Sequence, residues 1–342
     1  MSSVLLAGVI ILVVSFSSSL ILIPSLIRRL KEQGFMGRDM NKKEKVMLPE
    51  FGGLGVLFGF VLGLMSAIFL SSYLKLISLD LGILLSAFST VLLIGIIGLA
   101  DDLLGWKKGL KQWQHALLPI IAALPLMALK IGNPPVQLPL IGFLPASYLI
   151  PFFGAVSFSV IYSLIFVPVG VTGASNATNM LAGLNGLEAG LGAIIISTLA
   201  IISFSVNSTE AFILSIAMLG ALIAFLKFNW FPAKIFPGDS LTLMLGASIA
   251  SIVIIADMER IGLAIFLLYF IELVLKARTR MKAESFGTPV NGFLAPPKKT
   301  GSLTHVVMRL GKFSELKVVS IILGAQLIIS LVVLFLFFNS LI

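Results

Sequence analysis

Residues 172–190 read TGASNATNMLAGLNGLEAG, a polar stretch inside an otherwise very apolar chain. The stretch holds three Asn, one Glu and four Gly, but no Lys or Arg. Asn176 and Asn179 are three residues apart and therefore share one face of a helix, while the glycines let backbone or ligand approach closely. Unpaired polar groups are costly at membrane depth and are usually functional there. The stretch therefore predicts a polar pocket at the mouth of an apolar bundle.

The composition around this stretch is that of a polytopic membrane protein. Of the 342 residues, 58% are hydrophobic and 11% are charged, and the mean hydropathy is +1.10. The first apolar run lacks a basic leader and a small-residue cleavage site, so we expect a membrane anchor rather than a signal peptide. The absence of Cys excludes disulfides and thiol chemistry. With only two His in the chain, a transition-metal cluster is not expected.

Ten apolar runs are candidate membrane spans, with ends uncertain by several residues. They lie at about 4–27, 51–71, 81–100, 115–129, 148–171, 185–205, 211–227, 240–256, 261–276 and 317–338. We therefore predict an all-α integral membrane protein in which residues 1–342 form a single domain with about ten transmembrane helices. Between the runs, the Pro-rich segment 130–147 is expected to form an extended turn or a short hairpin.

The basic residues predict the orientation in the membrane. Segments 28–50, 101–114, 227–239 and 276–317 hold 7, 3, 2 and 9 of the 24 Lys and Arg residues. By the positive-inside rule these segments face the cytoplasm, and both termini face the other side. The same asymmetry accounts for the net charge of +9, so nucleic acid is not expected as a partner.

Acidic residues gather at the predicted cytoplasmic ends of the spans: Asp39, Glu50, Asp101, Asp102, Glu188 and Asp239. Adjacent carboxylates, as in GLADDLLGW, stay ionised only when they are solvated or paired with a cation, often a metal. The alternative for Asp101 and Asp102 is a pair of interfacial acids that end a helix. In FPGDSLTLML, Asp239 can cap a helix N-terminus, which does not exclude metal binding. Glu50 stands directly before a Gly-rich span and borders the apolar phase.

The long cytoplasmic loop 277–315 supplies positive charge beside these acids. Arg278 and Arg280 bracket one residue just after a span, and forked guanidinium donors suit diphosphate oxygens. Lys276 and Lys282 are expected only to reach the lipid headgroups. His305 lies in the same loop, where a structural role is the alternative to a substrate-binding one.

Together these residues offer hard oxygen ligands, amides and Arg side chains. Such a set suits Mg²⁺, with Mn²⁺ as the alternative, and Mg²⁺ is commonly held by carboxylates and substrate phosphates. This combination favours phosphoryl transfer, in which the protein positions the reacting groups and neutralises charge.

The motifs GLADDLLGW, ATNMLAGLNGLEAG and FPGDS occur in this order, each at a cytoplasmic span end. In this combination they resemble the polyprenyl-phosphate N-acetylhexosamine-1-phosphate transferases over nearly the whole chain. NGLEAG and the segment LPEFGG are closer to the dolichyl-phosphate GlcNAc-1-phosphotransferases of eukaryotes and archaea than to the bacterial phospho-MurNAc-pentapeptide translocase. The His-His-His loop motif of the bacterial enzyme is absent.

The resemblance implies a ten-span enzyme with a cytoplasmic active site. It would transfer GlcNAc-1-phosphate from UDP-GlcNAc to a polyprenyl (dolichyl-type) phosphate and release UMP, the first membrane step of lipid-linked oligosaccharide synthesis for N-glycosylation. By the same resemblance, Asn179 and Asp239 would be the Mg²⁺ ligands. Asp101 and Asp102 would be the catalytic acids, acting either as base or as organisers of metal and charge.

The resemblance also implies a set of substrate contacts. Asn185 would contact the uracil, Glu50 would lie near the nucleotide, and Arg278 and Arg280 would grip the diphosphate or the sugar. Thr279 stands where the dolichyl enzymes carry His. Many members carry a Lys after the paired acids; in the best register His115 stands there, with Lys111 one turn earlier. Either residue could supply the positive charge, and Lys111 is preferred.

Several alternatives stay open. The donor could be another UDP-N-acetylhexosamine and the acceptor undecaprenyl phosphate. In a different class, the chain could be a transporter or flippase of a lipid-linked substrate, although no repeat relates its halves. A plasma membrane location is favoured over the endoplasmic reticulum, and a homodimer is compatible with the sequence.

Overall fold

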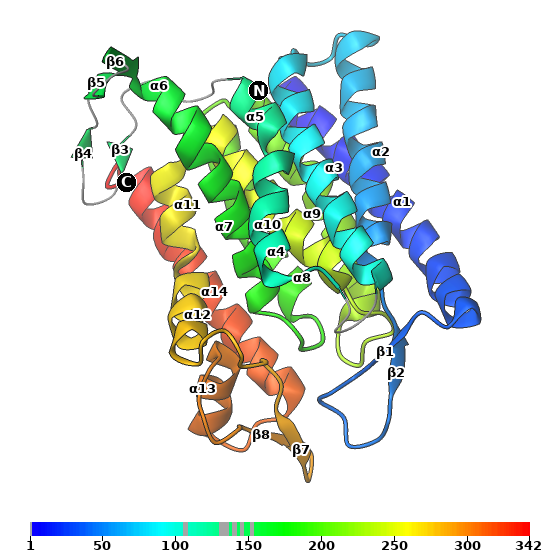
Figure 1. Ribbon diagram of the computed structural model, residues 1–342. Coiled ribbons are helices and arrows are strands. Elements are labelled where there is room, and N and C mark those ends of the chain that lie inside the picture. The colour runs from blue at the N-terminus through cyan, green and yellow to red at the C-terminus, as the bar shows by residue number, and fades with distance from the viewer. Residues whose placement is uncertain (1, 105–108, 130–136, 139–141, 144–146, 151–153) are drawn as a thin grey trace.

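The structure, a computed structural model, describes residues 2–104, 109–129, 137–138, 142–143, 147–150 and 154–342. Eight helical segments in this part of the chain are long and apolar enough to cross a membrane. They are α1 (Ser2–Gln33), α2 (Gly52–Ser72), α3 (Leu81–Leu104), the continuous segment α6–η1–α7 (Phe158–Met180), α8 (Leu187–Ser205), α9 (Thr209–Asn229), α10 (Gly238–Ile255) and α14 (Glu315–Phe338). The protein is thus a helical integral membrane protein (Figure 1).

Two of the ten predicted spans are each divided into two shorter helices. The run at 115–129 forms α4 (Gln112–Ala122) and α5 (Leu124–Ala128), and the run at 261–276 forms α11 (Glu259–Ile265) and α12 (Leu267–Arg278). Pro125 stands in the first turn of α5, where a residue without an N–H group ends one helix and begins the next. Between α11 and α12 the chain departs from helical geometry at Phe266, whose ψ is 9°.

Antiparallel hairpins flank the helices. β1 (Met36–Arg38) pairs with β2 (Met47–Pro49), and β7 (Thr288–Val290) pairs with β8 (Phe293–Ala295). Both hairpins lie at the lower end of the bundle in Figure 1, whereas β3 (Gln137–Leu138) with β4 (Gly142–Phe143) and β5 (Ser147–Ile150) with β6 (Gly154–Ser157) lie toward the upper end. In the segment predicted as a turn or hairpin, the described residues form the β3–β4 pair and the start of β5.

The middle of the bundle is α10, in which every residue from 240 to 255 is buried. Two glycines, one on the neighbouring helix α3 and one on α10 itself, allow this packing. A Cβ atom at Gly98 of α3 would lie 2.5 Å from the Asp239 carbonyl oxygen, and one at Gly246 of α10 would lie 2.2 Å from the Ala174 carbonyl oxygen of α7 (Val167–Met180). Small residues permit this close approach of helices in membranes. As a result, the first turn of α10 lies between the ends of α3 and α7.

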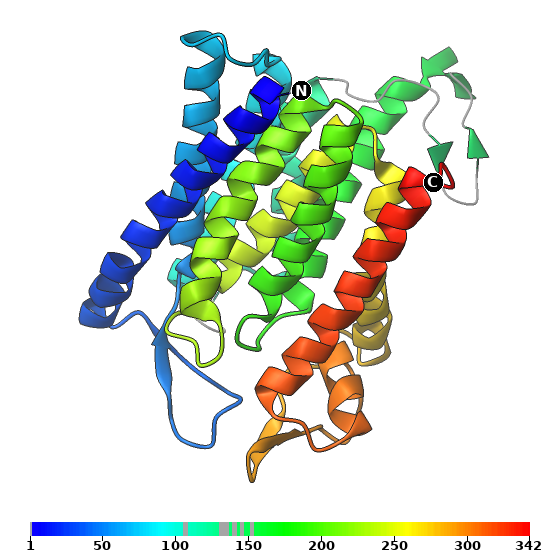
Figure 2. The same ribbon diagram turned by 180° about the vertical axis from the view of Figure 1, so that it is seen from behind.

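Both chain ends lie toward the end of the bundle opposite to the β1–β2 and β7–β8 hairpins (Figures 1 and 2). The lower end carries the connections between α1 and α2, α9 and α10, and α12 and α14. These connections include three of the four Lys/Arg-rich segments. That this end faces the cytoplasm stays a prediction from the positive-inside rule.

Candidate active site

A cavity of about 740 Å³ opens at the lower end of the bundle. Its walls come from the β1–β2 hairpin, from the ends of α3, α7 and α10, and from one residue of the 277–315 loop. The polar residues among its lining are Arg38, Asp39, Glu50, Asp101, Asp102, Asn179, Glu188, Asp239 and Thr242. Seven of the acids and amides named in the sequence analysis therefore line one cavity: Asp39, Glu50, Asp101, Asp102, Asn179, Glu188 and Asp239.

The two adjacent acids of α3 do different things, because neighbouring residues on a helix point about 100° apart. The carboxylate of Asp102 accepts hydrogen bonds from the backbone N–H groups of Asp239 at 2.7 Å and Ser240 at 3.1 Å. It thereby caps the N-terminus of α10, where backbone donors and the helix dipole favour negative charge. Gly238, with φ of 73°, precedes this turn, and a Cβ atom there would lie 2.5 Å from an Asp102 carboxylate oxygen. Asp102 therefore fixes the position of α10.

Asp101, in contrast, is directed to the other titratable groups of the site. It is 7% exposed, accepts a hydrogen bond from Leu110 N–H, and lies 3.2 Å from the Nε2 atom of His115 through its Oδ2 atom. Its carboxyl group also contacts that of Asp239. One ligand atom from each of Asp101, His115 and Asp239 lies within 4.8 Å of the other two. Two carboxylates this close repel each other unless a proton or a cation lies between them.

Asn179 completes this group from α7. Its Oδ1 atom accepts a hydrogen bond from Thr242 Oγ1 at 3.1 Å, and Asn179 and Asp239 both line the cavity. The structure therefore brings together Asn179 and Asp239, which are far apart in sequence. Asn176, on the same face of α7, donates from Nδ2 to the backbone oxygen of His115 at 3.0 Å and so ties α4 to α7.

These side chains fit a divalent cation. Asp101, Asp239 and Asn179 offer the oxygen ligands that Mg²⁺ prefers, and the imidazole of His115 is a ligand that transition metals also accept. His115 is the residue that sequence reasoning underestimated, because the chain has few His and Lys111 was the preferred source of positive charge. In the structure Lys111 is exposed and outside the cavity lining.

Glu50 is held at the cavity wall by the β1–β2 hairpin. Met36 pairs with Pro49 in this hairpin, and Pro49 accepts a hydrogen bond from the N–H group of Phe236, just before α10, at 2.8 Å. Burial, and secondarily the charge of Asp102, raises the pKa of Glu50 above its usual value. Glu50 thus lies beside the acids of α3, as its sequence position suggested.

Asn185 forms hydrogen bonds to other residues of the protein. It is buried, its backbone N–H donates to Glu315 at 2.8 Å, and its Nδ2 atom donates to Asp39 at 3.3 Å. Lys42 forms ion pairs with both of these carboxylates. Asn185 is not among the described residues that line the cavity, so its contact with a nucleotide stays a prediction.

The predicted contacts from the 277–315 loop are also outside the described cavity lining. Arg278, the last residue of α12, and Arg280, in the turn that follows, are both exposed. His305 is buried, and its ring nitrogens face the Phe286 carbonyl oxygen at 3.1 Å and the Gly301 N–H at 3.3 Å. Burial lowers the pKa of His305 below its usual value. From this loop, the described residue that reaches the cavity is Phe286.

Two further acids at the cavity were noted in the sequence without a role. Glu188 is 4% exposed and accepts a hydrogen bond from Gly183 N–H at 2.6 Å. Asp39 accepts from Asn41 N–H at 3.0 Å. Both acids stabilise the loops that form the cavity wall, and their spacing from the span ends gave no signal of this.

The fold and the cavity define an integral membrane protein with an acidic cavity at one end of its bundle. The chain belongs to glycosyl transferase family 4, whose sequence pattern matches residues 84–257, and it is a transferase. This region runs from α3 to the end of α10 and includes Asp101, Asn179 and Asp239.

Relatives extend the match beyond that region. A protein of Sulfolobus acidocaldarius is 38% identical over 93% of each chain, and one of Saccharolobus solfataricus is 35% identical over 96% of each chain. Both carry the provisional name UDP-N-acetylglucosamine–dolichyl-phosphate N-acetylglucosaminephosphotransferase. A phospho-N-acetylmuramoyl-pentapeptide-transferase of Halalkalibacterium halodurans is 35% identical over 72% of this chain and 74% of its own.

Proposed function

We propose that this protein transfers GlcNAc-1-phosphate from UDP-GlcNAc to a polyprenyl phosphate of the dolichyl type and releases UMP. The two archaeal relatives, which match almost the whole chain, carry a name for this reaction. The observation that carries the proposal is the group formed by Asp101, Asn179 and Asp239 in a cavity at the end of a membrane bundle, with His115 beside Asp101. A phosphoryl transferase needs such a group to neutralise charge on a diphosphate.

Asp101, Asp239 and Asn179 would hold a divalent cation, Mg²⁺ by ligand preference, with His115 at its edge. Bound there, the cation would supply charge neutralisation for the donor diphosphate. The close approach of Asp101 to Asp239 supports this assignment, because two adjacent carboxylates are stabilised by a shared cation. Asp102, with both carboxylate oxygens occupied by α10, is assigned to holding Asp239 in place rather than to binding substrate.

The reaction proposed is a direct displacement. An oxygen of the acceptor phosphate bonds to the phosphorus that carries the sugar, and the bond from this phosphorus to the bridging oxygen of the donor breaks, so that UMP leaves with that oxygen. The acceptor needs no strong base, since the second pKa of a phosphate monoester is about 6. The role of Asp101 is therefore assigned to orienting and charge balance.

Arg278 and Arg280 are proposed as contacts of the donor diphosphate or sugar. Both are exposed next to the cavity-forming loop, and Arg280 lies in a turn with φ of 54°. Since neither lines the described cavity, this role requires the 278–281 turn to move toward bound substrate. Asn185 is proposed to contact the uracil, from a position behind the cavity wall.

The deciding experiment is transfer of radiolabelled sugar phosphate from a panel of UDP-sugars to dolichyl and undecaprenyl phosphate, with release of UMP measured in parallel. We expect Mg²⁺-dependent formation of labelled lipid and of equal UMP with UDP-GlcNAc and dolichyl phosphate. Preference for another UDP-N-acetylhexosamine or for undecaprenyl phosphate would change the substrate assignment and keep the chemistry. Absence of UMP release with every pair would contradict the enzymatic proposal and favour a transporter.

We propose the plasma membrane as its location, because the relatives that match almost the whole chain are archaeal. Fractionation of cells from the source of this chain, with the protein detected in the plasma membrane fraction, tests this assignment.

A further inference from the structure

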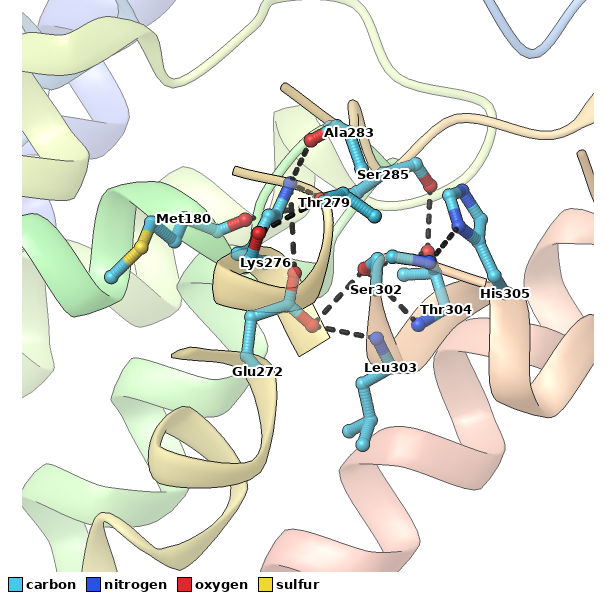
Figure 3. Close-up of polar contacts among 12 residues, drawn as sticks. Met180, Glu272, Lys276, Thr279, Ala283, Ser285, Ser302, Leu303, Thr304 and His305 are labelled. Atoms are coloured by element: carbon cyan, nitrogen blue, oxygen red, sulfur yellow. Dashed lines mark hydrogen bonds and ion pairs between the residues drawn. The ribbon is translucent and has the colours of Figure 1, made fainter. Parts of the chain in front are cut away.

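A second polar cluster lies outside the cavity, at the end of α12. It consists of Glu272 and Lys276 on α12, Ser285 in the following loop, and Ser302 before α13 (Leu303–Leu310), and we call it the α12 cluster (Figure 3). All four residues are buried. Burial of a charged pair is costly unless its hydrogen bonds are satisfied, so the partners of each group indicate what the cluster does.

Lys276 does not reach the lipid headgroups as the sequence suggested. Its side chain is 8% exposed, and its Nζ atom lies 3.6 Å from Glu272 Oε1. The same ammonium group donates to the Ala283 carbonyl oxygen at 2.7 Å and to Ser285 Oγ at 3.0 Å. The ammonium group thus donates two hydrogen bonds, both to the segment that follows α12, and its contact with Glu272 Oε1, a buried atom that accepts no hydrogen bond from the described residues, is an ion pair.

Glu272 holds the other end of the same loop. Its Oε2 atom accepts hydrogen bonds from the Leu303 N–H at 2.6 Å and from Ser302 Oγ at 3.1 Å. Ser302 in turn caps α13 by accepting from the Thr304 N–H at 3.3 Å. The ion pair on one helix therefore fastens both the beginning and the end of the 283–302 excursion.

Hydrogen bonds connect the α12 cluster to residues that directly neighbour the cavity lining. Ser285 Oγ donates to the carbonyl oxygen of Met180 at 3.3 Å, and Met180 follows the predicted metal ligand Asn179. The Ser285 carbonyl oxygen accepts from Thr304 Oγ1 at 2.7 Å. The next residue is Phe286, which lines the cavity and whose ring is 2.5 Å from the point where a Cβ atom on Gly183 would lie.

His305 fixes the same short segment from the other side. Because its Nδ1 atom accepts from Gly301 N–H at 3.3 Å, its Nε2 atom carries the proton and donates to the Phe286 carbonyl oxygen at 3.1 Å. Residues 285 and 286 are therefore held through Lys276, Thr304 and His305, none of which touches the cavity. The position of residues 285 and 286 at the cavity wall therefore depends on these side-chain hydrogen bonds, since the two residues are not part of a helix.

We infer that Glu272 and Lys276 are positioning residues that hold Phe286 at the cavity wall and thereby determine affinity for the donor nucleotide sugar. The inference rests on the proposed function for the identity of the donor. The chemical step depends on the separate group on α3, α7 and α10, so the α12 cluster affects donor binding more than turnover at saturating donor. Our inference places the donor, and not the acceptor lipid phosphate, against this wall, so the affinity for the acceptor should change little.

The test is steady-state kinetics of Lys276→Met and Ser285→Ala in purified, detergent-solubilised full-length protein. We expect Lys276→Met to raise KM for UDP-GlcNAc by roughly 10- to 100-fold, because misplacement by about 1 Å of a positioning group has effects of this order. The kcat at saturating donor and the KM for dolichyl phosphate should change less than about threefold. Ser285→Ala, which keeps the ion pair, should raise the donor KM by a smaller factor.

Arg309→Ala is the matched control within the same loop. Arg309 donates to Thr300 and to the carbonyl oxygens of Pro297 and Lys298 on the exposed side of the loop, away from Phe286. Its donor KM should stay near that of the wild type. Glu272→Gln keeps the shape and the acceptor oxygen, so it should restore part of the affinity lost in Glu272→Ala.

The outcomes separate this inference from the proposed function. If the wild type does not turn over UDP-GlcNAc, the proposed function fails, and protection of residues 283–290 from hydrogen exchange by UDP still tests the cluster. If the wild type is active and Lys276→Met and Ser285→Ala keep the wild-type donor KM, the inference is wrong. A fall in kcat equal to the rise in KM, with a lowered Tm, would also contradict it, since that is the mark of a general loss of structure.

Discussion

The two polar groups of this protein are built in different ways. The group formed by Asp101, His115, Asn179 and Asp239 is placed by helices, whose approach is set by glycines such as Gly98 at backbone contact distance. The α12 cluster is placed by side-chain hydrogen bonds that hold a long loop against α7. Rigid helices suit charge organisation, which tolerates little displacement, whereas a loop held by a few replaceable bonds suits recognition of a particular ligand. The comparison predicts which changes remove chemistry and which change only affinity or stability.

The largest effect is expected in the helix-borne group. Asp239→Ala and Asn179→Ala should each lower kcat by on the order of 10²- to 10³-fold or more, because each removes a fixed group that neutralises charge. Radiolabelled transfer with the folded state checked by size-exclusion chromatography measures this. Asp257→Asn, an exposed acid just beyond the opposite end of α10, is the control and should leave kcat unchanged. Near-normal Mg²⁺-dependent transfer by either Ala variant would refute the metal assignment.

His115 is expected to contribute the next largest effect. His115→Ala should weaken the apparent affinity for the divalent cation by roughly 10- to 100-fold, as loss of groups that contact a metal site does. A titration of activity with Mg²⁺ and Mn²⁺ measures it. Lys111→Ala is the matched control, since this side chain is exposed. A larger effect of Lys111→Ala than of His115→Ala would reverse the assignment made from the geometry.

The close packing of α3 against α10 can be tested at a glycine. In Gly98→Ala the new methyl group would meet the Asp239 carbonyl oxygen at 2.5 Å, so the free energy of unfolding should fall by about 1–3 kcal/mol, as overpacking does. Gly324→Ala is the control, because a Cβ atom at Gly324 of α14 meets nothing within 4 Å. Thermal unfolding in detergent compares the two. Equal Tm values would show that α3 and α10 are not held at this distance.

Loss of the helix cap provided by Asp102 should have a smaller effect on the free energy of unfolding. Asp102→Ala should lower the free energy of unfolding by about 1 kcal/mol, the usual value for loss of a helix cap, and kcat should fall because Asp239 loses its fixed position. Asp102→Asn keeps an acceptor oxygen and should lose less of both. The same Tm for Asp102→Ala and the wild type would contradict the capping role.

The smallest effect is expected at Glu50, and it concerns how stability depends on pH. Its sign follows from the linkage between proton binding and folding. Burial raises the pKa of Glu50 in the folded protein above 4.5, so the folded state binds this proton more tightly than the unfolded state does. The contribution of Glu50 to stability is therefore fully present below the unfolded pKa and is lost as the pH rises through the folded pKa. Since Gln cannot titrate, the Tm of Glu50→Gln minus that of the wild type should increase as the pH rises above about 4.5. A constant difference in Tm would show that Glu50 is not buried at the cavity.

The sequence by itself determined the class of fold and most of the ingredients of the site. Long apolar runs can only be helices where no water is present to satisfy the backbone, and hard oxygen ligands at span ends indicated a cation site. Asp101, Asp102, Asp239 and Glu50 were identified from such positions, and the family resemblance predicted Asn179 and Asp239 as metal ligands. The family resemblance is confirmed by the match at residues 84–257 and by the archaeal relatives.

Only the tertiary structure decided what each member of the set does. Asp101 and Asp102 are neighbours in sequence, and their side chains leave α3 about 100° apart. One meets His115 and the other caps α10, because only the packing of the helices decides which partner lies in each direction. The structure likewise placed His115 in the site and Lys111 outside, and buried Lys276 in an ion pair where the sequence suggested contact with lipid. Hydropathy and residue spacing indicate whether a segment favours water or forms a helix. A hydrogen bond between segments that are distant in the sequence forms only when the whole bundle has packed.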